Sequence, residues 1–204
     1  MRVELVNIGK RYNKNYVFKN LSYVFEPNKT YAITGKNGSG KSTLLQIIYG
    51  YLTHSEGEIL YTFNGIKINE GELYKHVSFT SPYLELPEDF TLAEILDFHF
   101  SLVQPVSSFN VAEVLKQSKL AGSENKFIKA FSSGMKQRLK LILAIYTQSP
   151  LLLLDEPTSN LDDEGMFWYK QTILSNHSKR TIIIASNQHF EYDFCDDVIK
   201  ISDY

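Results

Sequence analysis

Residues 35–42, Gly35-Lys36-Asn37-Gly38-Ser39-Gly40-Lys41-Ser42, decide the fold because they match the phosphate-loop pattern G-x-x-x-x-G-K-[S/T]. The pattern also has the flanks that it requires, since a strand is expected over residues 29–34 and a helix over residues 41–50. Glycines let backbone N–H groups turn inward around phosphate oxygens, and the helix N-terminus adds positive potential. Lys41 can reach the β- and γ-phosphates, and Ser42 can bind Mg²⁺. The correct flanks argue against an incidental glycine-rich turn.

Two carboxylates follow an apolar run later in the chain. Residues 151–154 are four leucines, which predict a buried parallel strand, and Asp155 and Glu156 come directly after them. Open α/β sheets bind their ligands just beyond the carboxyl ends of the strands. We therefore expect Asp155 to hold Mg²⁺ and Glu156 to orient or activate an attacking water. Taken alone, the pair is equally consistent with acidic residues that cap a strand end.

Composition narrows the class of protein. The chain has 204 residues, of which 43% are hydrophobic and 22% charged, as in an ordinary globular protein. Its 21 basic and 23 acidic residues give a net charge of −2, so bulk charge predicts no nucleic-acid partner. The single cysteine, Cys195, is typical of a reducing compartment. The apolar stretches are far shorter than the roughly 20 residues that span a bilayer, and the N-terminus shows no targeting pattern. We expect a cytosolic chain.

Periodicity extends the prediction to both sides of the phosphate loop. Asn64-Gly65 between two alternating runs is a strong hairpin signal, and Thr91 with Glu94 forms a capping box. The first part of the chain is therefore rich in strands, the middle third is helical, and the end alternates strand and helix. The expected elements are strands at 2–8, 21–26, 29–34, 77–79, 151–154 and 181–185, a hairpin at 57–68, and helices at 41–50, 91–103, 107–120, 132–148 and 162–177.

These residues together resemble one family. The resemblance rests on the phosphate loop, on Ser132-Ser133-Gly134-Met135-Lys136-Gln137-Arg138, on the leucine run with Asp155-Glu156-Pro157-Thr158, and on Ser159-Asn160-Leu161-Asp162. In order and spacing they are similar to the nucleotide-binding domain of ATP-binding cassette (ABC) transporters, over nearly the whole chain. The resemblance implies an α/β fold: a P-loop NTPase (ABC ATPase) core with an antiparallel β portion and a helical insertion lobe. The expected single domain, 1–204, has its core lobe at 1–81 and 150–204 and its helical lobe at 82–149.

The resemblance further implies a composite ATP site between two domains that dimerise head to tail. Each ATP would lie between the phosphate loop of one domain and the signature segment of the other, here residues 131–135. Ser132 can cap the helix that begins near it, and the N–H of Gly134 can face a γ-phosphate. Tyr12 matches the aromatic that stacks on adenine, with Tyr16 and Phe18 as rivals. The expected nucleotide-binding residues are Tyr12, Gly35, Asn37, Gly38, Ser39, Gly40, Lys41, Ser42, Thr43, Ser132 and Gly134, with Ser42 and Asp155 as ligands of Mg²⁺.

Two positions depart from the family pattern. Asn187 stands where the family has a histidine that senses the γ-phosphate, and His189 follows two residues later. Pro82 aligns with the position where the family has a glutamine. We assign Glu156 and Asn187 as the catalytic residues, and we expect tight nucleotide binding with slow hydrolysis.

The resemblance implies an ATPase subunit that drives transport through a separate membrane-spanning permease subunit, as a homodimer or as a heterodimer with a second ABC ATPase. Residues 81–89, with apolar Tyr83, Leu84 and Leu86, are the expected docking surface. The signature segment leans toward exporter-type systems. The expected location is cytoplasmic and peripheral, on the inner face of the cell membrane through this partner. One alternative is a soluble ABC ATPase that acts in assembly of another complex. A P-loop kinase or GTPase is the other, although the chain lacks an N-K-x-D guanine reader.

Overall fold

The apolar runs of the sequence become a parallel sheet in the computed structural model, which describes residues 1–176 and 180–204. The sheet has the strand order β6-β7-β8-β3-β9, and β3 pairs in parallel with both β8 and β9, as β7 does with β8. Every residue of β7 and β8 is buried, which explains why both strands are continuous apolar runs. Its strands are β3 (Thr30–Thr34), β6 (Val77–Thr80), β7 (Leu151–Asp155), β8 (Thr181–Ala185) and β9 (Asp197–Lys200).

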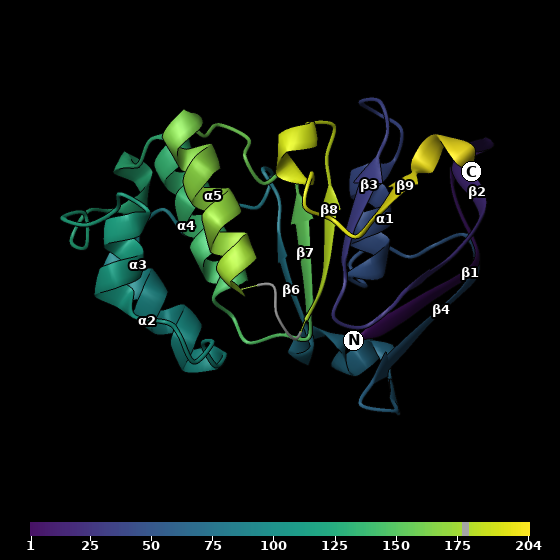
Figure 1. The fold of residues 1–204 in the computed structure, drawn as a ribbon, viewed down its shortest axis with the longest axis horizontal. Coiled ribbons are helices and arrows are strands. Elements are labelled where there is room, and N and C mark those ends of the chain that lie inside the picture. Colours follow the sequence, from purple (N-terminus) through teal and green to yellow (C-terminus); the bar gives the residue numbers. More distant parts are fainter. Residues whose placement is uncertain (177–179) are drawn as a thin grey trace. The chain divides into compact units, whose positions relative to one another are not determined.

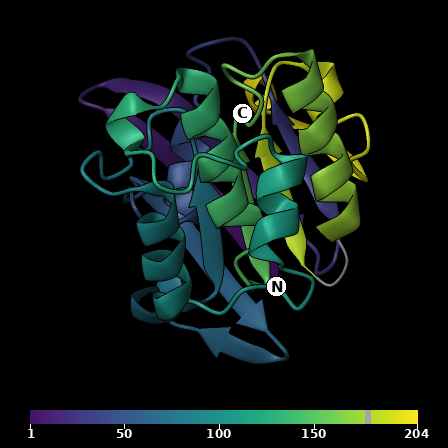
Figure 2. The same cartoon turned by 90° about the vertical axis from the view of Figure 1, so that its left-hand side faces the viewer.

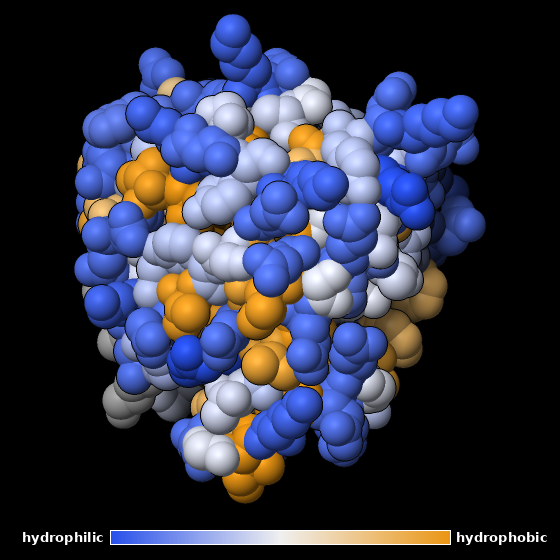
Figure 3. All heavy atoms as spheres, turned by 90° about the vertical axis from the view of Figure 1, so that its right-hand side faces the viewer, coloured by the Kyte–Doolittle hydropathy of each residue, from blue (hydrophilic) through white to orange (hydrophobic). Residues whose placement is uncertain are grey.

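The opening of the chain forms most of a second, antiparallel sheet. Its order is β2-β1-β4-β5, from β1 (Arg2–Tyr12), β2 (Asn15–Phe25), β4 (Glu56–Phe63) and β5 (Ile66–Ile68). The expected hairpin is confirmed at β4 and β5, where Asn64 and Gly65 both have positive φ, 50° and 78°. On the face seen in Figure 3, hydrophobic residues form small separate patches among hydrophilic ones.

Helix α1 (Lys41–Ile48) follows the phosphate loop and contacts β7 and β8. Its Leu44, Leu45, Ile47 and Ile48 are buried in one hydrophobic cluster with side chains of both sheets. The loop before α1 starts at the carboxyl end of β3, and the carboxyl end of β7 carries Asp155. Parallel strands end at the same edge of a sheet, so the fold explains why these two distant segments meet.

The remaining α-helices are α2 (Leu92–Leu102), α3 (Val111–Gln117), α4 (Ser133–Ile145) and α5 (Asp163–Asn176) (Figure 1). The capping box at the start of α2 is confirmed, because Thr91 Oγ1 accepts from the Glu94 N–H and the Glu94 carboxylate accepts from the Thr91 N–H. α3 is shorter than expected, since Asn110 caps it three residues after the expected start. Residue 177, the expected end of α5, lies outside the described residues.

The chain consists of two compact units, and each is described by itself. The sheet unit comprises residues 1–79, 149–156 and 180–204, and the helical unit comprises residues 80–148 and 157–176. The expected helical lobe, 82–149, is close to the first of these helical ranges. The helical unit differs from it mainly because it also includes α5. The reason is that α5 packs along α4, as Figure 2 also shows, with the Arg138 guanidinium 5.9 Å from the Trp168 ring. Among the described residues, no helix combines the length and the hydrophobicity of a membrane-spanning segment.

Candidate functional site

The phosphate loop is held against the antiparallel sheet by a close approach at Gly40. This residue has φ 100°, and a Cβ there would lie 2.4 Å from Val17 Cγ1. Only glycine permits both the left-handed backbone and this contact. Val17 lies on β2. No pattern in the sequence indicates that it packs against the phosphate loop, because this contact joins residues that are distant in the chain.

Lys41 lies inside the curve of the loop. Its ammonium donates hydrogen bonds to the carbonyl oxygens of Gly35 at 2.8 Å and Lys36 at 3.3 Å, and the residue is 4% exposed. The Ser39 hydroxyl is covered from solvent and has no hydrogen-bond partner among the described residues. A buried cation beside an unsatisfied hydroxyl, both within a glycine-rich turn at a helix N-terminus, fits a phosphate group.

Ser42 and Asp155 meet across the end of the parallel sheet. The Ser42 hydroxyl donates to Asp155 Oδ1 at 2.9 Å, and Asp155 is 1% exposed. Burial raises the pKa of Asp155 to about 6, against the lowering effect of the hydrogen bond from Ser42. A hydroxyl and a buried carboxylate are both oxygen ligands, which fits the preference of Mg²⁺.

Glu156 follows with a strained backbone. Its φ is 42°, in the left-handed region that a residue with a side chain rarely adopts, and its N–H donates to the Ala185 carbonyl at 2.9 Å. Such outliers persist only where the surroundings fix them, and they occur often at functional sites. The chain therefore turns sharply at the residue that directly follows Asp155.

The loop after β8 contacts the phosphate loop through Asn187. Its Nδ2 donates to Asn37 Oδ1 at 2.5 Å. His189, the rival for the sensing role, has its ring against Tyr192, with centroids 5.4 Å apart. In the part of the chain that the structure describes, Asn187, and not the His189 ring, thus makes the hydrogen bond to the phosphate loop.

The three aromatic candidates for adenine stacking have different surroundings. Tyr12 ends β1, is 51% exposed, and has the Lys10 ammonium 4.9 Å from its ring centroid. The Tyr16 hydroxyl donates to the Glu56 carboxylate. Phe18 is only 2% exposed and belongs to the core cluster, so it offers no ring face to a ligand.

The signature segment lies in the helical unit. Ser132 is the N-cap of α4, as expected, and its hydroxyl accepts from the Met135 N–H at 3.2 Å. Gly134 packs against the segment after β7, since a Cβ there would lie 3.0 Å from the Asn160 carbonyl oxygen. The expected site residues are therefore distributed over both units: the phosphate loop, Asp155, Glu156 and Asn187 in one, and Ser132 and Gly134 in the other.

The expected docking surface includes a turn that starts at Ser81. The Leu84 N–H donates to the Ser81 carbonyl at 3.2 Å, which puts Pro82 and Tyr83 at the central positions. Tyr83 is 82% exposed and Leu84 41% exposed, whereas Leu86 is half-buried. Packing of all three side chains inside the helical unit is the alternative to a docking surface; it is wrong for Tyr83 and Leu84, whereas Leu86 is partly covered.

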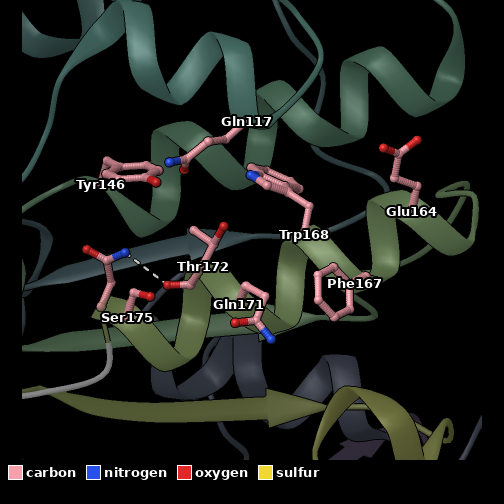
Figure 4. A pocket seen from close by; sticks show the side chains of 9 residues that line it. Gln117, Tyr146, Glu164, Phe167, Trp168, Gln171, Thr172 and Ser175 are labelled. Atoms are coloured by element: carbon pink, nitrogen blue, oxygen red, sulfur yellow. Dashed lines mark hydrogen bonds between the residues drawn. The ribbon is translucent and has the colours of Figure 1, made fainter.

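A hollow of about 350 Å³ opens in the helical unit between α3, the end of α4, and α5 (Figure 4). Trp168, Tyr146 and Gln117 are among the residues that line it, and Trp168 is 6% exposed. None of the predicted site residues lines this hollow. Trp168 is therefore a residue of the helical core.

Comparisons with known proteins agree with this geometry. The family model described as ABC transporter matches residues 18–159. The ABC transporter ATP-binding protein YybJ of Bacillus subtilis (strain 168) is 31% identical over 209 residues, which cover 98% of this chain and 89% of that protein. The cytochrome c biogenesis ATP-binding export protein CcmA of Reclinomonas americana is 36% identical over 186 residues, covering 89% and 81%.

The fold is shared with a solved structure, a dimeric post-hydrolysis state of the ATP-binding cassette MJ0796 bound to ADP and Pi. Its TM-score is 0.78 at 24% sequence identity, and the match covers 97% of this chain and 93% of that chain. The family match extends from β2 past the signature segment and Glu156. The chain therefore belongs to the ABC transporter family, and it is the ATP-binding, ATP-hydrolysing domain of that family.

Proposed function

We propose that this chain binds ATP with Mg²⁺ and uses hydrolysis to drive a separate membrane-spanning subunit. The observation that carries the proposal is the Ser42–Asp155 hydrogen bond beside the buried Lys41 ammonium. It joins a phosphate cradle to a cation site at one edge of the parallel sheet. An incidental glycine-rich turn would need neither a buried cation nor a buried carboxylate nearby.

The roles of the residues follow from their chemistry. The loop N–H groups and Lys41 bind the terminal phosphates, and Gly40 lets the loop approach closely. Ser42 and Asp155 hold Mg²⁺, which neutralises phosphate charge when bound. Glu156 orients the attacking water and accepts its proton. Asn187 donates a hydrogen bond toward the γ-phosphate, and Tyr12 stacks on adenine. Thr43 and Asn37 contribute further contacts to the bound nucleotide.

The site is completed by a second domain. Ser132 and Gly134 begin a 13-residue helix, and its N-terminus provides positive potential for a γ-phosphate. Dimerisation of two cassettes head to tail would supply this helix across the interface, in a homodimer or with a second ABC ATPase. The dimeric state named for the cassette MJ0796 supports this arrangement.

The membrane partner is inferred from the exposed Tyr83 and Leu84 and from the family. The chain is proposed to lie in the cytoplasm, on the inner face of the cell membrane, through that partner. Export is the favoured direction, because the signature segment is similar to those of exporter-type systems and CcmA is named an export protein. The second candidate, a soluble ABC ATPase that acts in assembly, requires wholly soluble partners.

Purification in a gentle detergent tests the membrane role. The wild-type chain is expected to recover a polytopic membrane protein, and the double substitution Tyr83→Asp with Leu84→Asp is expected to lose it, because two charges cannot pack on an apolar docking site. A matched control is Tyr51→Asp with Ile66→Asp, which also charges two exposed apolar positions. Retained recovery by the docking variant, with its fold shown intact by circular dichroism, contradicts the docking surface. A wholly soluble set of partners favours the assembly candidate.

ATP is expected to drive dimerisation. In Glu156→Gln the base is lost and hydrolysis slows, so the closed dimer should accumulate with ATP and Mg²⁺ and show twice the monomer mass by light scattering. Without nucleotide the chain should be largely monomeric. A monomer at saturating ATP would count against the homodimer and leave the heterodimer.

Asn187→His is expected to speed hydrolysis. A carboxamide cannot carry the positive charge that an imidazole can, so it stabilises the transition state less. A charge-assisted hydrogen bond is worth about 1.5–3 kcal/mol, which corresponds to roughly ten- to a hundred-fold in rate. Single-turnover hydrolysis on the assembled dimer measures this step. An unchanged rate in Asn187→His, together with loss of activity in His189→Ala, would show that His189 is the sensing residue.

A further inference from the structure

Helix α4 carries three polar side chains that are buried. Gln137, Arg138 and Lys140 are 2%, 7% and 7% exposed. Buried polar groups need partners, and Gln137 and Arg138 both find theirs in the segment between β7 and α5. Gln137 Nε2 donates to the Pro157 carbonyl at 2.8 Å, and Arg138 forms a 2.6 Å ion pair with Asp162.

Lys140 differs from the other two in its partners. Its ammonium donates to the carbonyl oxygens of Pro82 at 2.7 Å and Ser81 at 3.4 Å. It forms no ion pair with any described carboxylate, while Lys136 on the same helix pairs with Glu88. Burial lowers the pKa of Lys140, and the charge of Lys136 lowers it further. A buried charge held only by carbonyl dipoles is costly to stability, so an apolar side chain would serve packing better.

The two carbonyls belong to the root of the turn that presents Tyr83. Ser81 is 4% exposed, and its carbonyl accepts from both the Leu84 N–H and Lys140. Pro82 fixes its own φ at the first central position of the turn. The root of the turn is therefore held rigidly, whereas the Tyr83 side chain at its tip is exposed.

We propose that Lys140 is a positioning residue that connects the Ser81–Leu84 turn to helix α4. When a docked partner displaces Tyr83, the helix and its N-terminal residues Ser132 and Gly134 would move with the turn. The helix is continuous from Ser133 to Ile145, and Lys140 lies about two turns from its N-terminus. A rigid helix moves as one body, so a displacement at Lys140 reaches the N-terminus. This inference rests on the proposed function, since Tyr83 is displaced only if a partner docks there.

Hydrogen exchange on the full chain tests the tether without any partner or nucleotide. Lys140→Met removes the ammonium and keeps an unbranched chain, so the Leu84 amide, which donates to Ser81, should exchange about ten-fold faster or more. Lys140→Arg, which still donates to both carbonyls, should restore most of the protection. Lys119→Met is the matched control, because Lys119 lies in the same unit in an exposed ion pair with Glu164. Equal protection of the turn in Lys140→Met and wild type overturns the proposal.

A fluorophore attached to the cysteine of Tyr83→Cys tests whether movement of the α4 N-terminus reaches the Ser81–Leu84 turn. Burial raises the pKa of the Cys195 thiol to about 12, and Cys195→Ser removes it from the labelling. In a Glu156→Gln background, ATP should change the probe signal when Lys140 is present and lose most of that effect in Lys140→Met. Light scattering follows the dimer in the same samples, and calorimetry should give unchanged ATP affinity. A probe response equal with and without Lys140, while the dimer forms, refutes transmission. Failure of the dimer itself contradicts the proposed function instead.

Discussion

The hydrogen bond between Ser42 and the buried carboxylate of Asp155 is the contact on which the site depends. It joins the start of α1 to the end of β7, two segments that lie 113 residues apart in sequence. Parallel pairing through β8 brings these strand ends to one edge, and the Gly40–Val17 contact holds the loop against the antiparallel sheet. The positions of the phosphate loop, the cation ligands and Glu156 all follow from this one alignment of strands.

In the helical unit, helix α4 is the element on which the arrangement of the signature segment depends. Its N-terminus carries Ser132 and Gly134, and its buried polar side chains bind the segment after β7 and the Ser81–Leu84 turn. The ion pair between Arg138 and Asp162 illustrates the constraint, because a Cβ at Gly165 would lie 2.7 Å from the guanidinium. A helix that served only to fill a core would carry apolar side chains at these positions. Here the polar side chains instead bind the segment after β7, which passes close to Gly134 at Asn160, and the Ser81–Leu84 turn.

Local signals in the sequence predicted much of this. The phosphate loop, the Asn64–Gly65 hairpin, the Thr91 capping box and the Ser132 cap each depend on residues a few positions apart, and the structure has all four. Contacts between distant residues gave no such signal. The Val17–Gly40 contact, the Lys140 tether and the grouping of α5 with the helices all arise from tertiary packing. The full lengths of β1 and β2 were missed for a related reason: Asn7 and Asn20 adopt positive φ at irregularities in the pairing, which interrupts the alternation.

The central claim is that Ser42 and Asp155 hold a cation beside a nucleotide phosphate. The most direct measurement is ATP affinity by calorimetry with and without Mg²⁺, in the wild type and in Asp155→Asn, which keeps the shape of the side chain and removes its charge. The account predicts that Mg²⁺ tightens ATP binding to the wild type, and that most of this gain is lost in Asp155→Asn while Mg²⁺-free binding is retained. An equal gain from Mg²⁺ in both proteins would contradict it.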